Sequence, residues 1–373
     1  MISHPFRFDL LARQARARAG TFHTPHGDIE TPIFAPVGTQ ATVKAVTPTQ
    51  LAEIGASLVL ANTYHLYLRP GADLIASLGG LHKFMAWDRP ILTDSGGYQV
   101  FSLAKIRKID DEGVTFKSAI DGSSHRFTPV SSIQIQQKLG ADIIMTFDEC
   151  TDPLDRKGVE KAMHRTHAWA EECVRVKSRS DQALFGIVQG GAYPDLREQS
   201  TQFISSLPLP GFAIGGLSVG ESKSQMLAIL ELVDSILPEN KPRYLMGVGS
   251  PEDLLNGISR GVDIFDCVLP TRLARHQAAF TPAGRINLVN AVYFDDPKPI
   301  DETCGCYTCQ NFSLAYLRHL ILAKEILAAI LVSIHNLFFL LDLTRKSRQT
   351  IFTGTFSDFA GSFLEKYKVR HAQ

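Results

Sequence analysis

Short runs of apolar residues recur along the chain, and a polar residue or a glycine closes each run. The runs cover residues 33–37, 58–62, 91–94, 143–148, 184–189, 212–216, 244–247 and 262–266. They are continuous rather than alternating, which is the pattern of parallel strands that are covered on both faces. Eight parallel strands are the number in a closed (β/α)8 barrel. The pattern therefore predicts an α/β fold of the TIM-barrel type.

Helical segments with recognisable ends lie between several of these runs. One is predicted to begin at Thr128-Pro129 and to end at Gly140, and another to begin at Ser250-Pro251 and to end near Gly261. The same alternation of strands and helices also fits an open, doubly wound sheet. Because no Gly-x-Gly-x-x-Gly motif follows the first run, we expect the barrel.

Two other segments change this picture. Residues 113–127 are predicted to form an inserted hairpin that turns at Asp121-Gly122. The apolar run 326–341 is shorter than the roughly 20 residues that a membrane span needs, and it contains Ser333 and His335. We expect a buried helix there and no membrane association.

The composition is that of an ordinary globular protein, with 45% apolar and 20% charged residues among 373. Lys and Arg balance Asp and Glu at 38 each, so nucleic-acid binding would require a local basic patch. Cys150, Cys173 and Cys267 are scattered and no secretory signal is evident, which favours the cytoplasm. The arginines among the first 20 residues leave an organelle-targeting segment as the alternative.

Three of the six cysteines, Cys304, Cys306 and Cys309, fall within six residues, and His335 follows them. Three thiolates and one imidazole make a closed tetrahedral set that suits zinc, so we predict one structural zinc ion per subunit. The alternatives are buried or disulfide-bonded cysteines, or His319 as the fourth ligand. We place a zinc-binding subdomain at residues 292–345, within a single catalytic domain that spans residues 1–373.

Polar residues close most of the apolar runs, and the carboxyl ends of barrel strands form the active-site floor. These residues are Asn62, Asp94, Asp148, Gln189, Gly216, Gly247 and Asp266. A single buried aspartate is more often a helix cap or a salt-bridge partner. Three together, with an amide and paired glycines, favour a site in which two carboxylates act at a sugar anomeric carbon. The third carboxylate and the amide suit the hydrogen-bonding edge of a purine.

The same strand-end segments, with the cysteine cluster, are similar to those of bacterial tRNA-guanine transglycosylases over nearly the whole chain. The matching segments are Asn62-Thr-Tyr-His-Leu, Leu92-Thr-Asp94-Ser-Gly-Gly-Tyr-Gln-Val-Phe, Phe147-Asp148-Glu-Cys150, Gly186-Ile-Val-Gln189-Gly-Gly, Gly215-Gly216-Leu217-Ser-Val219-Gly-Glu221, Tyr244-Leu-Met246-Gly-Val-Gly249, Phe265-Asp266-Cys-Val-Leu-Pro-Thr-Arg272 and the cysteines with His335. This resemblance implies a zinc-containing barrel enzyme. It would exchange guanine at wobble position 34 of GUN-anticodon tRNAs (Asp, Asn, His and Tyr type) for 7-aminomethyl-7-deazaguanine, a precursor of queuosine.

By the resemblance, Asp266 is the nucleophile that attacks C1′ and holds a covalent RNA intermediate, and Asp94 is the general acid and base. The base-binding positions would be Asp94, Ser95, Gly96, Gly97, Tyr98, Asp148, Cys150, Gln189, Gly215, Gly216, Leu217, Val219 and Met246. Among these, Tyr98 and Met246 would sandwich the ring. Cys150 and Val219 match the bacterial pattern for the aminomethyl precursor.

Contacts with the anticodon loop are expected from two segments. They comprise Gly247, Val248, Gly249, Ser250, Pro251, Glu252 and Asp253, and Thr271, Arg272, Leu273, Ala274 and Arg275. Without the resemblance, surface solvation would explain the arginines. Leu273, Ala274 and His276 depart from the small or polar residues expected in the family, which affects recognition of the nucleotides next to the wobble base rather than the chemistry.

Phe312, Tyr316 and His319 share one helical face, which either packs inside the zinc subdomain or, as the resemblance implies, helps to form a homodimer. Two rival functions share some of these features. A barrel glycoside hydrolase would use the carboxylate pair but would not need Asp148 and Gln189 to read a base. A non-catalytic RNA-binding relative would have lost the nucleophile, whereas Asp266 is present.

Overall fold

The computed structural model describes residues 6–103 and 107–367. Its centre is an eight-stranded parallel sheet in the order β4-β14-β13-β12-β11-β10-β6-β5. These strands are β4 (Ile33–Pro36), β5 (Val59–Ala61), β6 (Ile91–Thr93), β10 (Ile143–Met145), β11 (Ala183–Val188), β12 (Gly211–Ile214), β13 (Arg243–Leu245) and β14 (Ile264–Cys267). Each overlaps one of the eight predicted runs.

The two outer strands of this order meet and close the barrel. Val37 forms a parallel bridge with Leu60, and the Gly38 backbone N lies 2.6 Å from the Leu60 carbonyl oxygen. The prediction of a (β/α)8 barrel is thereby confirmed, and the open sheet is excluded. Closure places the carboxyl ends of all eight strands around one opening.

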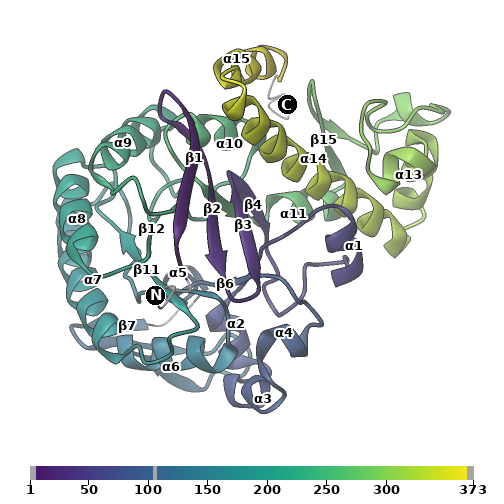
Figure 1. Ribbon diagram of the computed structural model, residues 1–373. Coiled ribbons are helices and arrows are strands. Elements are labelled where there is room, and N and C mark those ends of the chain that lie inside the picture. The colour runs from purple at the N-terminus through teal and green to yellow at the C-terminus, as the bar shows by residue number, and fades with distance from the viewer. Residues whose placement is uncertain (1–5, 104–106, 368–373) are drawn as a thin grey trace.

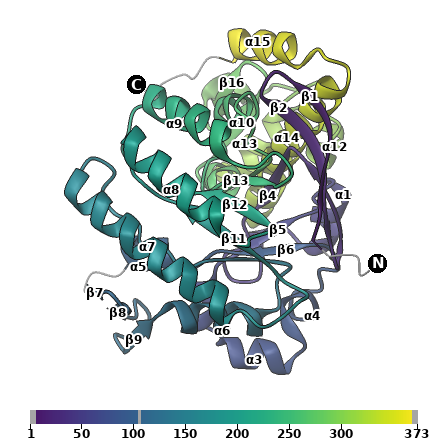
Figure 2. The same ribbon diagram turned by 60° about the vertical axis from the view of Figure 1, so that its left-hand side comes forward.

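Helices surround the barrel, as Figures 1 and 2 show. They are α1 (Pro48–Glu53), α2 (Thr63–Leu68), α3 (Ala72–Ser77), α4 (Gly80–Phe84), α5 (Gly97–Leu103), α6 (Pro129–Leu139), α7 (Arg156–Val176), α8 (Pro194–Ser206), α9 (Lys223–Ile236), α10 (Pro251–Ile258), α14 (Ile326–Phe352) and α15 (Phe356–Lys366). Helix α5 lies at the carboxyl ends of the strands, and α15 packs on α14. The predicted helix ends are present. Thr128 caps α6, which ends at Gly140 with φ +77°, and the Ser250 side chain accepts a hydrogen bond from the Asp253 N–H.

An antiparallel sheet that the sequence analysis did not predict precedes the barrel and lies across one of its ends (Figure 1). It consists of β1 (Phe8–Gln14), β2 (Ala17–Thr24) and β3 (Gly27–Thr31). A register shift between Leu10 and Ala12 breaks the alternation of β1, which explains why its pattern was not recognised. Phe22 packs edge-on against Phe185 of β11, so the sheet covers the barrel interior at the amino-terminal end of the strands.

The turn between β2 and β3 is fixed to the amino-terminal end of the barrel. His26 Nδ1 and His82 Nε2 lie 2.7 and 3.1 Å from the two carboxylate oxygens of Asp142, which is fully buried. The Ile91 N–H donates to the same carboxylate at 2.9 Å. These contacts hold the sheet at the end opposite to the carboxyl ends of the strands.

The predicted hairpin is present as β8 (Gly113–Lys117) and β9 (Ser124–Phe127), with Gly122 at φ +76° in its turn. A further strand, β7 (Arg107–Asp110), pairs with β8 and was not predicted. Its four residues are exposed or half-buried, so it lacks the apolar pattern that marks the barrel strands.

Helix α14 contains the apolar run 326–341 and, by length and composition only, is apolar enough to cross a membrane. It packs instead against β1, β2, β4, α10 and α11. Ser333, His335 and Asn336 are fully buried in it. The expectation of a buried helix is confirmed, and α14 is the outer helix that follows β14.

The segment between β14 and α14 forms a small lobe beside the barrel, seen at the right of Figure 1. It contains α11 (Leu269–Arg275), β15 (Ala278–Thr281), β16 (Gly284–Asn287), the 3₁₀ helix η1 (Ala291–Tyr293), α12 (Tyr307–Asn311) and α13 (Leu314–Leu322). Its apolar cluster includes Cys304, Cys306 and Cys309 and ends at Val332 of α14. The lobe therefore connects β14, the strand that carries Asp266, to α14, the helix that carries His335.

Candidate functional site

A cavity of about 530 Å³ opens at the carboxyl ends of the barrel strands. Fourteen of the residues that the sequence analysis assigned to binding or catalysis line it: Asp94, Ser95, Tyr98, Asp148, Cys150, Gln189, Gly215, Gly216, Leu217, Val219, Met246, Gly247, Asp266 and Arg272. Further lining residues were not assigned a role, including His65, Gln99, Ser102, Ser218 and Tyr244. Tyr244 and Gln99 lie inside or beside apolar stretches of the sequence. A single polar side chain in such a stretch does not by itself indicate a functional role.

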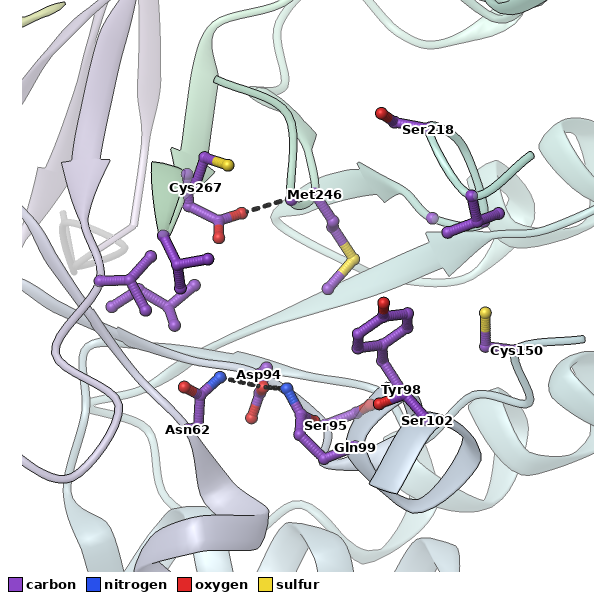
Figure 3. Close-up of a pocket in the computed structure, with 18 of the residues that line it drawn as sticks. Asn62, Asp94, Ser95, Tyr98, Gln99, Ser102, Cys150, Ser218, Met246 and Cys267 are labelled. Carbon is purple, nitrogen blue, oxygen red and sulfur yellow. Dashed lines mark hydrogen bonds between the residues drawn. The ribbon is translucent and has the colours of Figure 1, made fainter. Parts of the chain in front are cut away.

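Asp94 follows β6 and is held by three donors. The amides of Asn62 and Gln99 lie 2.6 and 2.7 Å from Oδ2 (Figure 3). The Thr63 N–H donates to Oδ1 at 2.8 Å. Burial raises the pKa of Asp94 to about 6, the three hydrogen bonds oppose that rise, and the negative charge of Asp266 adds to it. An acid with a pKa near neutrality can both donate and accept a proton.

Asp266, in β14, faces the same cavity from another strand. The Tyr244 hydroxyl donates to its Oδ1 at 2.5 Å, and the Gly247 N–H donates to the same oxygen at 2.7 Å. Burial raises the pKa of Asp266, and these two hydrogen bonds counteract the rise. The structure thus brings Asp94 and Asp266 together in one cavity, where both are buried and close enough for the charge of one to affect the pKa of the other.

The third carboxylate, Asp148, is bound on both oxygens. Ser95 Oγ donates to Oδ1 at 2.6 Å, and Gln189 Nε2 donates to Oδ2 at 2.8 Å. Glycines let the backbone approach this pair: a Cβ on Gly97 would lie 2.3 Å from the Asp148 carbonyl oxygen, and one on Gly216 would lie 2.4 Å from Gln189 Oε1. Carboxylate, amide and backbone groups converge here in a form suited to a planar heterocycle.

Two side chains lie on opposite sides of the cavity (Figure 3). The Tyr98 ring is 49% exposed at the amino-terminal part of α5, and Met246 follows β13 and is half-buried. A flat ring between them would contact the aromatic face and the thioether, both of which bind π-systems well. Cys150 is buried at the edge of the same cavity.

The two segments expected to contact RNA border this opening. Residues 247–253 run from the exposed Gly247 into α10, and α11 follows Asp266. Arg272 and Arg275 are exposed on α11, whereas Thr271 and Ala274 are buried. Among the described residues predicted to bind base or RNA, twelve do not line the cavity: Gly96, Gly97, Val248, Gly249, Ser250, Pro251, Glu252, Asp253, Thr271, Leu273, Ala274 and Arg275.

The cysteine cluster and His335 form a separate, buried group. His335 Nδ1 lies 3.7, 3.6 and 3.3 Å from the Sγ atoms of Cys304, Cys306 and Cys309. A tetrahedral zinc ion with normal bond lengths would separate nitrogen and sulfur by about 3.5 Å. The four donor atoms thus fit a metal ion, and three sulfurs with one nitrogen suit zinc best. His319, the alternative ligand, is exposed on α13 and lies outside the group.

The surroundings of His335 fix the imidazole for metal binding. Its Nε2 lies 2.7 Å from the Phe280 carbonyl oxygen, which can only accept, so Nε2 carries the proton and Nδ1 has the free lone pair. The neighbouring Asn336 donates to the carbonyl oxygens of Pro270 and Ala278 at 3.0 Å each and accepts from the Phe280 N–H at 2.9 Å. One turn of α14 therefore holds both the metal group and the segment that follows Asp266.

The raised pKa of Asp94 predicts a cost in stability at neutral pH. Because the folded-state pKa of about 6 exceeds the ordinary value of 3.8, folding is penalised progressively as the pH rises from 3.8 to 6. Asp94→Asn removes this charge. Gln99 now donates to Asp94 through Nε2, and if its amide turns over, Oε1, which has no partner among the described residues, can accept from the new amide. We expect urea unfolding to show the variant more stable by about 1–3 kcal/mol at pH 7.5 and little changed at pH 4.

Asp88→Asn, which removes an exposed carboxylate, is the matched control and should leave the pH dependence of stability unchanged. Parallel stability curves for Asp94→Asn and the unchanged chain would contradict the assigned pKa.

Removal of a metal ligand should release the ion and loosen the lobe. We expect metal analysis of the purified chain to give one zinc per subunit. His335→Ala should lose the zinc and unfold at a lower temperature, because the three buried cysteines are then no longer joined by a metal ion. His319→Ala should retain both the zinc and the unfolding temperature. Full zinc content in His335→Ala would contradict the ligand set.

Comparison with known proteins agrees with this architecture. The family model described as queuine tRNA-ribosyltransferase matches residues 13–369. A queuine tRNA-ribosyltransferase of Herpetosiphon aurantiacus is 57% identical over 369 residues, which cover 98% of this chain and 94% of that protein. Proteins of the same name from Halothermothrix orenii and Moorella thermoacetica are each 56% identical and cover 96% and 95% of this chain and 97% and 95% of their own lengths. The chain belongs to the queuine tRNA-ribosyltransferase family.

Proposed function

We propose that this chain is a tRNA-guanine transglycosylase that acts through a covalent Asp266–RNA intermediate in queuosine biosynthesis. It exchanges guanine at wobble position 34 of GUN-anticodon tRNAs, those of the Asp, Asn, His and Tyr type, for 7-aminomethyl-7-deazaguanine. The observation that carries the proposal is the convergence of Asp94 and Asp266 in one cavity, beside the base-sized site at Asp148 and Gln189. Family membership supports the reaction type.

The first step is a displacement at C1′ of the ribose. A carboxylate oxygen of Asp266 forms a bond to C1′ while the bond from C1′ to N9 of guanine breaks, and the electron pair goes to the base. Asp94, with its pKa near 6, gives a proton to the departing base. The second step reverses this order, because Asp94 takes a proton from the incoming base and that base displaces Asp266. Two inversions at C1′ give net retention.

The base is read by groups that differ in hydrogen-bonding character. The Asp148 carboxylate accepts from a ring N–H and the exocyclic amine, and Gln189 with the backbone at Gly216 and Leu217 faces the carbonyl side. Ser95 orients Asp148, Tyr98 and Met246 stack on the two faces, and Cys150 and Val219 border the space that receives the aminomethyl group. Guanine and its 7-deaza analogues share the edge that these groups contact.

The RNA enters with its wobble nucleotide turned out of the anticodon loop, because C1′ of a stacked nucleotide cannot reach a buried carboxylate. Residues 247–253 and 271–275 lie beside the opening, where Arg272 and Arg275 supply positive charge for phosphates. The formal net charge of the chain is zero, so this local charge matters more than the total.

We assign the remaining features as follows. Zinc is the structural ion, one per subunit, held by Cys304, Cys306, Cys309 and His335, and it takes no part in the displacement. The chain is one catalytic barrel domain, residues 1–373, with a zinc subdomain at 292–345. All six cysteines are free of disulfides, which fits a reducing cytoplasm.

The aromatic face of the lobe is assigned to a homodimer. Phe312 lies between α12 and α13 and not on the helical face predicted for it, but its ring stacks on that of Tyr316 in α13 at 5.3 Å between centroids. Tyr316 is 38% exposed, and His319 is exposed on α13. An exposed aromatic ring that is held by a half-buried one is typical of the centre of a subunit contact.

The reaction is tested by incubating the zinc-loaded protein with unmodified tRNA and labelled guanine and measuring label in the RNA. We expect incorporation by the unchanged chain, a loss of roughly 10,000-fold or more in Asp266→Asn because no nucleophile remains, and normal activity in Asp88→Asn. Prior treatment with 7-aminomethyl-7-deazaguanine should block later entry of guanine. A folded, zinc-loaded sample that incorporates no label would contradict the proposed reaction, and reducing sugar released from oligosaccharides would favour the hydrolase instead.

The homodimer is tested by measuring mass in solution. The unchanged chain should have twice its monomer mass of 41.1 kDa, and Tyr316→Ala should weaken dimerisation by about tenfold or more because a central ring is lost. Phe352→Ala, which removes an exposed ring from the distal end of α14, is the control and should leave the mass unchanged. A monomer at all concentrations would exclude the assignment.

A further inference from the structure

The two oxygens of Asp266 have different surroundings. Oδ1 accepts two hydrogen bonds, from the Tyr244 hydroxyl at 2.5 Å and from the Gly247 N–H at 2.7 Å. Within residues 6–103 and 107–367, no hydrogen bond engages Oδ2. A carboxylate whose one oxygen is bound by two donors presents the other oxygen to the cavity in a fixed orientation.

Tyr244 is placed for this contact by the barrel itself. It lies in β13, is 1% exposed, and belongs to the apolar cluster that includes Ile264 of the neighbouring β14 and Ala213 of β12. Its ring therefore fills the barrel interior while its hydroxyl reaches the strand end. Burial and the nearby charges of Asp266 and Asp94 raise the pKa of Tyr244 well above its ordinary value, so the phenol keeps its proton and remains a donor.

The strength of these hydrogen bonds changes during the proposed reaction. A carboxylate is a stronger acceptor than an ester, so donors on Oδ1 stabilise free Asp266 more than they stabilise the covalent intermediate. In the second step the bond between Oδ2 and C1′ breaks, its electron pair returns to the carboxylate, and C1′ bonds to the incoming base. Negative charge then develops on Asp266, where two preorganised donors receive it.

We propose that Tyr244 is a positioning residue for Asp266: together with the Gly247 N–H it binds Oδ1, leaves Oδ2 as the attacking atom, and stabilises the carboxylate that departs from the ribose in the second step. This inference rests on the proposed covalent reaction and deepens it. It assigns a function to a tyrosine that would otherwise be only part of the barrel core.

The test is Tyr244→Phe, which keeps the ring and removes only the hydroxyl. The covalent enzyme–RNA complex is formed without added base and is then chased in the native state with excess labelled guanine at pH 8. At each time point a sample is denatured, and the covalent complex that remains in it is quantified. We expect the complex of Tyr244→Phe to decay about 10- to 100-fold more slowly and to reach a higher occupancy than that of the unchanged chain, because the departing carboxylate loses one charge-assisted hydrogen bond. The acid limb of the exchange rate should also move to higher pH.

Two further variants separate positioning from packing. Tyr193→Phe removes a tyrosine hydroxyl that donates to the Leu154 carbonyl oxygen at 2.6 Å, away from the cavity, and should leave the decay rate unchanged. Tyr244→3-fluorotyrosine keeps the donor and should restore decay to near that of the unchanged chain. Direct titration of 7-aminomethyl-7-deazaguanine should give the same Kd for Tyr244→Phe as for the unchanged chain, since Asp148 and Gln189 are untouched.

The outcomes distinguish this inference from the proposed function. If the unchanged chain forms no covalent complex, the covalent route itself fails. If the unchanged chain forms the complex but Tyr244→Phe decays at the same rate, or accumulates less complex while binding the base normally, Tyr244 does not stabilise the departing carboxylate and the inference is overturned.

Discussion

Closure of the parallel barrel is the constraint on which the rest of this structure depends. The bridge between Val37 and Leu60 joins the last strand in the sheet order to the first, so eight strand ends share one rim. Residues far apart in the sequence, such as Asp94 and Asp266, are thereby forced into one small volume. The antiparallel sheet at the opposite end, fixed through Asp142, leaves this rim as the end where a ligand can reach the interior.

Three carboxylates lie close together at that rim. Burying them is unfavourable for folding, but it raises their pKa values, which suits proton transfer in the proposed reaction. Burial raises the pKa of Asp94, Asp148 and Asp266, which means that the folded state disfavours their charges. Neighbouring donors limit the penalty, and each carboxylate has a different set: two amides and a backbone N–H for Asp94, a hydroxyl and an amide for Asp148, and a phenol and a backbone N–H for Asp266. Three chemically identical side chains thus acquire three different roles, as acid and base, as base reader and as nucleophile, in the function proposed above.

The metal lobe is linked to this rim through a single turn of α14. His335 joins the cysteine group, and Asn336 binds backbone groups on both sides of α11, the helix that follows Asp266. An ion bound by these four residues would order the segment that carries Arg272 and Arg275 without touching the cavity. This arrangement explains how the candidate metal group and the proposed catalytic residue Asp266 can belong to neighbouring segments of the chain.

The sequence by itself determined the eight strands, the capped helices, the hairpin and the three clustered cysteines of the candidate metal group, because each depends on local patterns of apolar residues, caps, turns and ligand spacing. It missed the antiparallel sheet β1–β3 and the strand β7. A register shift breaks the alternation of β1, and exposure removes the apolar signal of β7. The pattern of apolar runs fitted both a closed barrel and an open sheet, and it indicated no role for Gln99 or Tyr244. Only the tertiary structure decided that the barrel closes, that His335 rather than His319 completes the metal group, and which donors surround each carboxylate. The physical reason is that these properties arise from contacts between residues that are distant in the chain, and the direction of a buried side chain is set by the packing of its neighbours rather than by its place in the sequence.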